Sequence, residues 1–436
     1  MTQTDRDGIQ RRTEFRHLRR RFWAGLGAVK HNSNARYLLG AFLLGMCLLW
    51  MLRKVLFPLD TLGTLARPLD GLLQLSLLAL TVLGVMGILL SLGGPQGSLK
   101  TREALRKAGL TNHAGEVPIL VAKAQDKDHP RLTVWTFDPC GIPLEEWEDK
   151  QSRLEAALNI TIARMSWAMG RERICLYAVP AKGDLPERLL WQESYLSPAS
   201  FVLVLGEGLA GPVTVDLTRV PHVLLGGSTG SGKSVLLKLL LMQALRKGAQ
   251  VAIADFKGGV DFPDTWHRRC RMCFQEEDLL DLLTELVEEL ENRKKLFRRA
   301  ECPNLDRYHQ VTGVYLPRWI FACDEVAEVL DKTGLSKEEK ELVSQIESKL
   351  ATIARQGRAF GIHLILATQR PDANILPGQI KNNIDFRACG RADNVLSQII
   401  LDSADAAPRV PKEIPGRFLL LDGTLFQAYW FDENEL

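Results

Sequence analysis

One short stretch of the sequence has the residue types and spacing of a phosphate-binding loop. From position 227 to position 234 it fits the pattern G-x-x-x-x-G-K-[ST] throughout. Glycines let backbone N–H groups turn toward phosphate oxygens with no Cβ in the way, and the start of a following helix favours an anion. The predicted nucleotide-binding residues are Gly227, Ser228, Thr229, Gly230, Ser231, Gly232, Lys233 and Ser234.

Two loop side chains and two acids together predict hydrolysis of the bound nucleotide. Lys233 would reach the β- and γ-phosphates of ATP, and Ser234 would hold Mg²⁺. The apolar run 319–323 ends in Asp324 and Glu325. A carboxylate at such a strand end, here Asp324, can bind Mg²⁺ through water, while Glu325 is placed to orient or deprotonate the attacking water. We therefore expect an ATPase that uses ATP and Mg²⁺, with Lys233 and Glu325 among its catalytic residues.

A further apolar run, 362–367, leads into the polar residues Thr368 and Gln369. As a third catalytic residue, Gln369 could hydrogen-bond both the γ-phosphate and the attacking water, and so report the state of the nucleotide. A polar loop with no such role explains the same spacing equally well, so both interpretations stay open on the residues alone.

The elements around these residues alternate between apolar strands and amphipathic helices. A short strand over 222–225 precedes the phosphate-binding loop, a helix over 235–245 follows it, and the alternation runs on from about residue 200. Such a pattern is typical of a parallel sheet with helices on both faces. The sequence predicts an α/β motor domain over 201–436.

The segment 100–200 is predicted to form a small α/β domain of its own. Strands are expected over 117–121, 131–137 and 174–179, and a helix over 144–158. Nothing in the segment suggests chemistry.

The first part of the chain carries two apolar runs that predict a transmembrane hairpin over 36–95. Helices are expected at about 37–55 and 71–92. The apolar part of the first is roughly 24 Å long and the second roughly 33 Å, at 1.5 Å per residue, against a hydrocarbon core of roughly 30 Å. The second run has no charge. A buried core helix is therefore a weaker interpretation, because it would normally keep one polar face.

Cations flank the outer sides of the hairpin rather than its connector. A basic tail over 1–35 precedes it, and Lys100, Arg102, Arg106 and Lys107 follow it. Because cytoplasmic flanks are the richer in lysine and arginine, we expect a multi-pass protein of the cell membrane with both termini in the cytoplasm. The tail could also attract anionic lipid or DNA.

Bulk composition restricts the function little. The formal net charge of the 436 residues is +3, which neither favours nor excludes a nucleic-acid partner. The cysteines are scattered and read as free thiols in a reducing compartment. Cys270 and Cys273 form one CxxC, but only Cys302 and His267 lie near it in the sequence, so a zinc site is disfavoured.

Several ordered motifs over about residues 200–405 resemble the FtsK/SpoIIIE family of DNA motors. The similar segments are 212–217, 221–225, 354–363, 367–371 and 380–384. Single residues that also match the family are Glu291, Asn292, Arg293, Asn304 and Tyr308. The resemblance implies a RecA-like P-loop ATPase motor that forms a homo-hexamer and threads double-stranded DNA.

The resemblance also implies roles for residues outside the loop. By position, Arg358 would be a catalytic arginine finger that reaches the γ-phosphate of a neighbouring subunit; a plain surface arginine is the alternative. Lys257 lies where the family has a similar Asp-x-Lys. DNA would be held by its backbone with little sequence preference, because a ring motor must release each base pair as it steps. Lys381 and Arg387 are candidate pore cations, although ordinary surface charge explains them equally well.

The overall organisation resembles one branch of that family, the TcpA-like coupling proteins of Gram-positive mobile elements. Both have two apolar runs, a small soluble domain and a motor that ends in a strand, here over 426–431. Neither has an appended DNA-reading domain after that strand. The implied function is a membrane-anchored translocase that feeds transfer DNA to a secretion channel, with a relaxase and other transfer-channel proteins as partners. The alternatives are a chromosome-partition translocase, a type VII-like protein-secretion ATPase and a nucleotide-gated scaffold, the last disfavoured by the intact acid pair.

Overall fold

A computed structural model describes the chain at residues 18–19, 22–23, 25–27, 29–30, 33–57, 66–92, 98–181, 185–369, 376–433 and 436. The chain divides into two compact units, Met1–Lys182 and Gly183–Leu436. This division falls before the predicted boundary at residue 200, because β5 (Leu189–Leu190) pairs with β15 (Leu425–Trp430) of the second unit. Most of the predicted basic tail lies outside the described residues.

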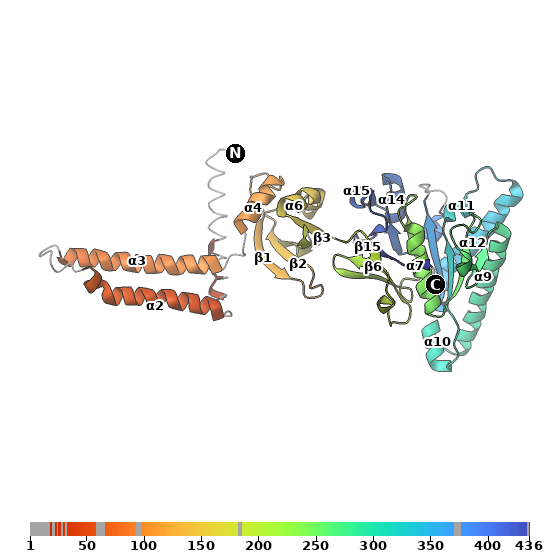
Figure 1. Cartoon of the computed structure of the whole chain (residues 1–436), viewed down its shortest axis with the longest axis horizontal. Coiled ribbons are helices and arrows are strands. Elements are labelled where there is room, and N and C mark those ends of the chain that lie inside the picture. The colour runs from red at the N-terminus through yellow and green to blue at the C-terminus, as the bar shows by residue number, and fades with distance from the viewer. Residues whose placement is uncertain are drawn as a thin grey trace. The chain divides into compact units, whose positions relative to one another are not determined.

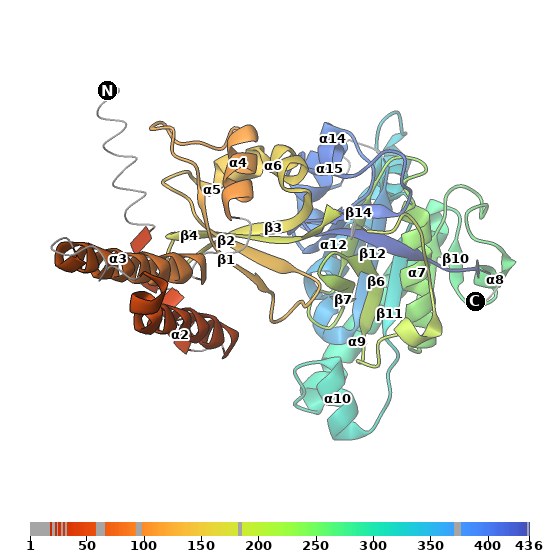
Figure 2. The ribbon, with the colours of Figure 1, turned by 60° about the vertical axis from the view of Figure 1, so that its left-hand side comes forward.

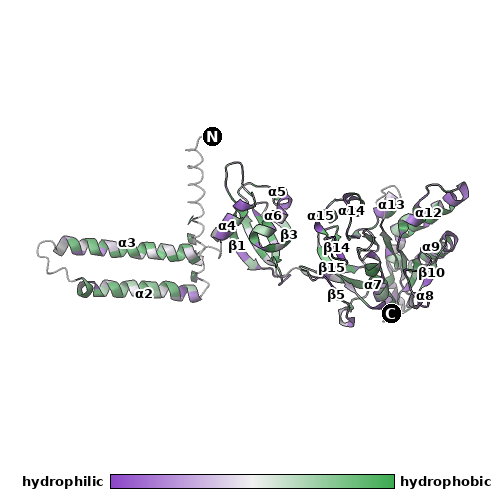
Figure 3. Ribbon diagram, turned by 45° about the horizontal axis from the view of Figure 1, so that its top comes forward, coloured by the Kyte–Doolittle hydropathy of each residue, from purple (hydrophilic) through white to green (hydrophobic). Residues whose placement is uncertain are grey.

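Two apolar helices, α2 (Ser33–Leu56) and α3 (Ala66–Leu92), form the predicted helical pair. Both are long and apolar enough to cross a membrane, and few of their side chains are buried. They lie side by side (Figure 1) and carry much of the green of hydrophobic residues (Figure 3). The ring of Phe42 fills the space beside Gly84, where a Cβ would come within 2.1 Å of it. Glycine at this position therefore permits the close approach of the two helices.

The small domain is an antiparallel sheet in the order β1-β2-β4-β3, with helices packed against it. Its elements are α4 (Ser98–Lys107), β1 (Ile119–Gln125), β2 (Thr133–Asp138), α5 (Leu144–Asp149), α6 (Gln151–Leu158), β3 (Ile160–Ala168) and β4 (Arg173–Pro180). The aromatic rings of Phe137 and Trp147 pack together in its core, with their centroids 5.2 Å apart. The predicted strands are present and the predicted helix is split into α5 and α6, while β3 and α4 are additions.

The second unit is built on one mixed sheet in the order β10-β9-β11-β12-β8-β13-β14-β15-β6-β7, with β5 beside β15. Its other strands are β6 (Val202–Gly208), β7 (Gly211–Asp216), β8 (Val223–Gly226), β9 (Gln250–Ala254), β10 (Arg271–Cys273), β11 (Trp319–Cys323), β12 (Ile362–Thr368), β13 (Phe386–Cys389) and β14 (Arg417–Leu420). The strands from β10 to β13 in this order run parallel, and those from β14 to β7 pair antiparallel.

Helices cover both faces of this sheet, as predicted (Figures 1 and 2). They are α7 (Lys233–Arg246), α8 (Asp264–His267), α9 (Glu276–Arg299), α10 (Leu305–Thr312), α11 (Val326–Leu330), α12 (Lys337–Phe360), α13 (Gly378–Lys381), α14 (Asn394–Leu401) and α15 (Ala406–Arg409). One apolar core forms around α7 with Leu239 and Phe426, and another forms under α9 and α12 with Leu286 and Leu350. The carboxyl ends of β8, β9, β11, β12 and β13 meet at one edge of the sheet, because these strands are parallel.

Candidate functional site

The predicted phosphate-binding loop connects β8 to α7 at the carboxyl edge of the sheet. β8 lies between β12 and β13. Gly230 and Gly232 have φ angles of 77° and 92°, a left-handed conformation that side chains with a Cβ rarely adopt. A Cβ on Gly232 would also lie 2.8 Å from the backbone nitrogen of Gly416. The turn of the loop therefore depends on glycine at these positions.

A lysine and a carboxylate form the buried centre of the site. Lys233 Nζ lies 2.8 Å from Asp324 Oδ1, and each side chain is only 3% exposed. Ser234 Oγ donates to the same carboxylate at 3.0 Å. The fold thus brings together Lys233, Ser234 and Asp324, although Asp324 follows a strand that is separated from β8 by β12.

The charges around Asp324 keep it ionised. Burial opposes the charged carboxylate and is the largest single influence, but Lys233, Lys257 and the Ser234 hydroxyl together outweigh it and lower the pKa of Asp324. Lys257 adds a second cation, with Nζ 3.0 Å from Asp261 Oδ2 and 3.3 Å from Asp324 Oδ2. Although burial acts against the charged amine, these carboxylates raise the pKa of Lys257. Asp324 is therefore a carboxylate at neutral pH, the form that binds Mg²⁺.

Glu325, the predicted base, is held by two donors at the end of β12. Thr368 Oγ1 donates to Glu325 Oε1 at 2.7 Å, and Gln369 N donates to Oε2 at 2.8 Å. Burial raises the pKa of Glu325 in spite of these hydrogen bonds, and a raised pKa makes a carboxylate a better proton acceptor. Each carboxylate oxygen accepts one of these hydrogen bonds and has a second lone pair, so Glu325 can accept from an attacking water while Thr368 and Gln369 hold it in place.

Gln369 joins Glu325 to the phosphate-binding loop. Its side-chain Oε1 accepts from Thr229 Oγ1 at 2.8 Å, while its backbone N–H donates to Glu325. One residue therefore touches both the loop and the predicted base, which is the place that a reporter of nucleotide state needs.

Arg391 also belongs to the site, although sequence reasoning missed it. It follows β13, and its guanidinium donates to the carbonyls of Thr229 and Lys412, the latter at 3.0 Å. Ser228 N donates to the Arg391 carbonyl at 2.7 Å, so the residue holds the loop from both its side chain and its backbone. The usable signal was its position two residues after the strand Phe386–Cys389, close to a strand end like the acids.

The described residues fit a nucleotide with Mg²⁺. Ser231 Oγ in the loop is buried and has no hydrogen-bond partner within the protein, as expected where a phosphate oxygen supplies one. Ser234 and Asp324 offer hydroxyl and carboxylate oxygens, the ligand types that Mg²⁺ prefers. Among the described residues no group of three His, Cys, Asp or Glu could hold a metal ion. Phosphate and water oxygens would therefore complete the coordination.

Arg358, the predicted finger, is not part of this site. It lies near the end of α12, exposed, and its Nε donates to the Thr218 carbonyl at 3.3 Å. Because α12 leads into the first residue of β12, Arg358 lies at the amino edge of the sheet, whereas the loop lies at the carboxyl edge. Any contact between Arg358 and a γ-phosphate would have to involve the nucleotide of another subunit.

The prediction that Arg387 is a pore cation is wrong. Its side chain is only 8% exposed and pairs with Asp402 Oδ2 at 2.6 Å, and its Nε donates to the Ile384 carbonyl. Lys381 pairs with the other oxygen of Asp402 at 2.6 Å. These cations hold the turn after α13 together, so the buried Arg387 cannot reach a DNA phosphate.

The cysteines of the CxxC are separate, buried thiols. Burial raises the pKa of Cys270 to about 12 and the pKa of Cys273 to about 11. Both are therefore protonated at neutral pH, which is the form that binds metal poorly.

The glycine loop after β8, the acid pair after β11 and the parallel part of the sheet define a P-loop ATPase fold. The model of the FtsK/SpoIIIE family matches residues 187–373. A solved structure of the pCW3 conjugation coupling protein TcpA, a monomer form with ATPγS, is 34% identical in sequence; the match covers 78% of this chain and 96% of that one, with a TM-score of 0.59. The chain belongs to the FtsK/SpoIIIE family, which confirms the resemblance drawn from its motifs.

Curated relatives match through the motor. The DNA translocase SftA of Bacillus subtilis is 32% identical over 236 residues, which cover 51% of this chain and 24% of the relative. The DNA translocase FtsK of Helicobacter pylori (strain J99) is 30% identical over 238 residues, with coverage of 51% and 26%. The chain therefore matches about a quarter of the length of these relatives.

Proposed function

We propose that this chain is a membrane-anchored, ATP-driven translocase of double-stranded DNA, and that it is the coupling protein for conjugative transfer of a mobile element. The observation that carries the proposal is the likeness to the TcpA coupling protein, which extends over 96% of that chain at 34% identity. The assembled set of Lys233, Ser234, Asp324 and Glu325 supports it, because a motor needs hydrolysis as well as nucleotide binding.

Hydrolysis would use the groups at the carboxyl edge of the sheet. Lys233 would leave Asp324 for the β- and γ-phosphates, and Ser234 and Asp324 would hold Mg²⁺. When bound, the metal neutralises charge on the phosphates during transfer. Glu325, held by Thr368 and the backbone of Gln369, would orient the attacking water and accept its proton.

A homo-hexameric ring would supply the part of the site that one subunit lacks. Arg358 would reach the γ-phosphate of a neighbour, as arginine fingers do in trans. Gln369 would pass the change from ATP to ADP on to the rest of the motor, since it touches both Thr229 and Glu325.

The apolar helices α2 and α3 would anchor the motor in the cell membrane with both termini in the cytoplasm. The charge asymmetry around them motivates this topology. A reporter that is active only outside the cytoplasm should give signal when fused after residue 62 and none when fused after residue 436. Signal from the C-terminal fusion would contradict the hairpin.

The DNA cargo would be held by its phosphate backbone with little sequence preference. The test measures ATPase activity of the full chain with unrelated duplexes at several salt concentrations, with Lys233→Ala as the inactive control. All duplexes should stimulate, and apparent affinity should fall by roughly 0.9 log units per log unit of salt for each phosphate neutralised. Preference for one duplex would contradict backbone-only binding. Stimulation by an unfolded protein and none by DNA would favour a secretion ATPase.

Conjugative transfer and chromosome partition differ in the proteins that the motor would have to bind. As a coupling protein the chain would bind a relaxase and other transfer-channel proteins. Deleting it should abolish transfer of the mobile element and leave chromosome partition normal, whereas a partition defect with normal transfer would favour the chromosome-partition alternative.

A further inference from the structure

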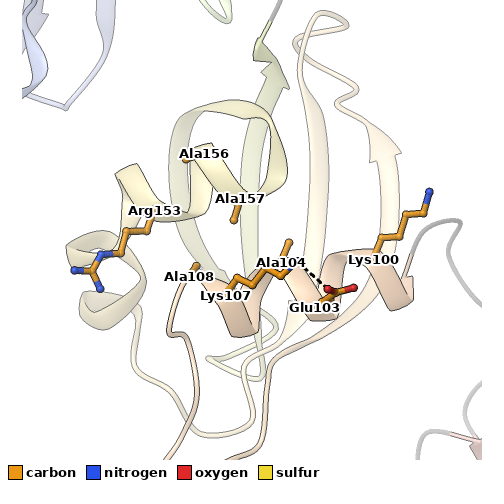
Figure 4. Close-up of a pocket in the computed structure, with 8 residues that line it drawn as sticks. All are labelled: Lys100, Glu103, Ala104, Lys107, Ala108, Arg153, Ala156 and Ala157. Atoms are coloured by element: carbon orange, nitrogen blue, oxygen red, sulfur yellow. Dashed lines mark ion pairs between the residues drawn. The ribbon is translucent and has the colours of Figure 1, made fainter.

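A basic groove in the small domain has no part in the functions described so far. It lies between α4 and α6 and has a volume of about 520 Å³. Figure 4 shows Lys100, Lys107 and Arg153 at its rim, and alanines from both helices, among them Ala104 and Ala157, on its floor. A cavity of this size suits a small ligand or a lipid headgroup.

The charge of the rim is not balanced within the domain. Lys107 pairs with Glu103 at 2.8 Å, with both side chains largely exposed. In the described part of the chain Lys100 and Arg153 have no ion-pair partner. Three cations against one carboxylate leave a formal charge of +2 at the rim. In Figure 4 the side chains of Lys100 and Arg153 lie at opposite ends of the groove and point outward, with Lys107 between them. An anion in the groove would gain from direct contact with the nearer cations and from the longer-range attraction of the others.

The position of α4 in the sequence decides which anion is close by. α3 ends at Leu92 and α4 begins at Ser98, so the chain between them reaches no more than roughly 20 Å. In a chain anchored by α3, which is the part of the proposed function on which this inference rests, α4 must therefore stay near the headgroup layer. The cytoplasmic leaflet carries anionic lipid that attracts lysine and arginine.

We infer that the α4–α6 groove binds the phosphate of an anionic phospholipid. Lys107 and Arg153 turn inward to contact the phosphate oxygens, Arg153 offering two N–H groups in parallel, and Lys100 adds electrostatic attraction from the far end of the groove. The alanine floor accepts the glycerol carbons, while Glu103 can accept a hydrogen bond from a hydroxyl of the headgroup. Duplex DNA fits less well, because it presents a long row of phosphates and this rim is short and interrupted by a carboxylate.

The test is native mass spectrometry of the full chain in detergent micelles that contain phosphatidylglycerol or phosphatidylcholine. The groove variant carries Lys100→Gln, Lys107→Gln and Arg153→Gln. A matched control removes three exposed cations elsewhere in the small domain: Arg106→Gln, Lys127→Gln and Arg171→Gln. Each cation should contribute about fivefold to the affinity for phosphatidylglycerol, so the groove variant should bind this lipid roughly a hundredfold more weakly. The control variant should bind phosphatidylglycerol as the wild type does. Neither set of substitutions should alter phosphatidylcholine binding.

Two further arms separate the ligands that share this chemistry. Ala157→Leu narrows the floor with all charges kept and should also weaken phosphatidylglycerol binding. Unchanged binding by Ala157→Leu or by the groove variant would overturn the inference. So would equal competition by soluble glycerol phosphate, or a loss of duplex binding in the groove variant with lipid binding intact. Release of the wild-type chain from membranes by an alkaline wash would instead contradict the anchoring, which the micelle measurement does not test.

Discussion

The two edges of the motor sheet both bury polar groups, but only one of them can exchange partners with a ligand. At the carboxyl edge Lys233 and Glu325 are held by side chains and loop atoms beside a glycine loop, and Ser231 Oγ has no protein partner. At the amino edge the partners of His222 and His363 are mostly backbone groups inside the core. Burial of polar groups alone therefore does not identify a ligand-binding site. A ligand-binding site also needs polar groups that can give up their protein partners for a ligand, beside backbone N–H groups that a ligand can reach.

The amino-edge network is a fixed support. His222 Nδ1 accepts from Leu364 N at 2.9 Å, so Nε2 carries the proton and donates to the Ala354 carbonyl at 3.1 Å. His363 Nδ1 lies 2.9 Å from the Pro221 carbonyl. Burial lowers the pKa of His222 to about 4 and the pKa of His363 well below its usual range. Both rings are neutral and join the strands that carry the site.

The largest expected effect comes from the one residue proposed to connect the two edges across subunits. Arg358→Ala should lower ATPase activity by roughly 10³-fold or more, while Arg355→Ala, an exposed arginine on the same helix, should retain it. Mixing Arg358→Ala with Lys233→Ala should restore part of the activity, because a mixed interface pairs an intact loop with an intact finger. Absence of recovery in mixtures shown to co-assemble would point to a role within one subunit.

The next largest effect is expected for Glu325, the proposed base at the carboxyl edge of the sheet. Glu325→Gln should still bind ATP but hydrolyse it at least about 10²-fold more slowly, because the amide cannot accept the proton. Glu338→Gln, an exposed glutamate in the first turn of α12, is the matched control and should behave as wild type. Hydrolysis by Glu325→Gln at the wild-type rate would show that another group is the base.

A smaller effect is expected for Arg391, which positions the loop. Arg391→Lys should raise KM for ATP about tenfold, since contacts from a charged donor to two carbonyls are lost, and should leave kcat nearly unchanged. Arg409→Lys is a suitable control, because Arg409 also donates to a carbonyl, that of Gly423, away from the loop. A fall in kcat at constant KM would mean that Arg391 acts in the chemical step instead.

The smallest effect on turnover is expected for the buried histidines of the amino edge, whose substitution should change stability instead. The pKa of His222 is about 4 in the folded chain, below the unfolded value of about 6.5. The unfolded state therefore binds more protons between these values, and stability should fall as pH falls from about 6.5 toward 4, by up to about 3 kcal/mol for this histidine. Denaturant midpoints should show a weaker pH dependence in His222→Asn than in wild type, while the exposed His113→Gln should leave it unchanged. Equal dependence in all three would contradict the assignment.

The features that could be predicted from sequence were those formed by residues that are consecutive in the chain. The loop at 227–234 and the acids after the run 319–323 could be found because strand, turn and helix signals adjoin them. The burial of Arg387 could not, because it depends on Asp402, which another loop supplies. The division of the chain at Lys182 could not be predicted for the same reason, because β5 is two residues long and is placed by its pairing with β15.

Displacement of a third strand from duplex DNA tests the central claim, ATP-driven movement along DNA, most directly. The full chain with ATP and Mg²⁺ should strip a triplex-forming oligonucleotide from duplexes of unrelated sequence at similar rates, and Glu325→Gln should bind the same duplexes without displacing it. Omitting ATP should stop displacement by the wild type. Hydrolysis of ATP on DNA with no displacement from any duplex, or displacement by Glu325→Gln at the wild-type rate, would contradict the account.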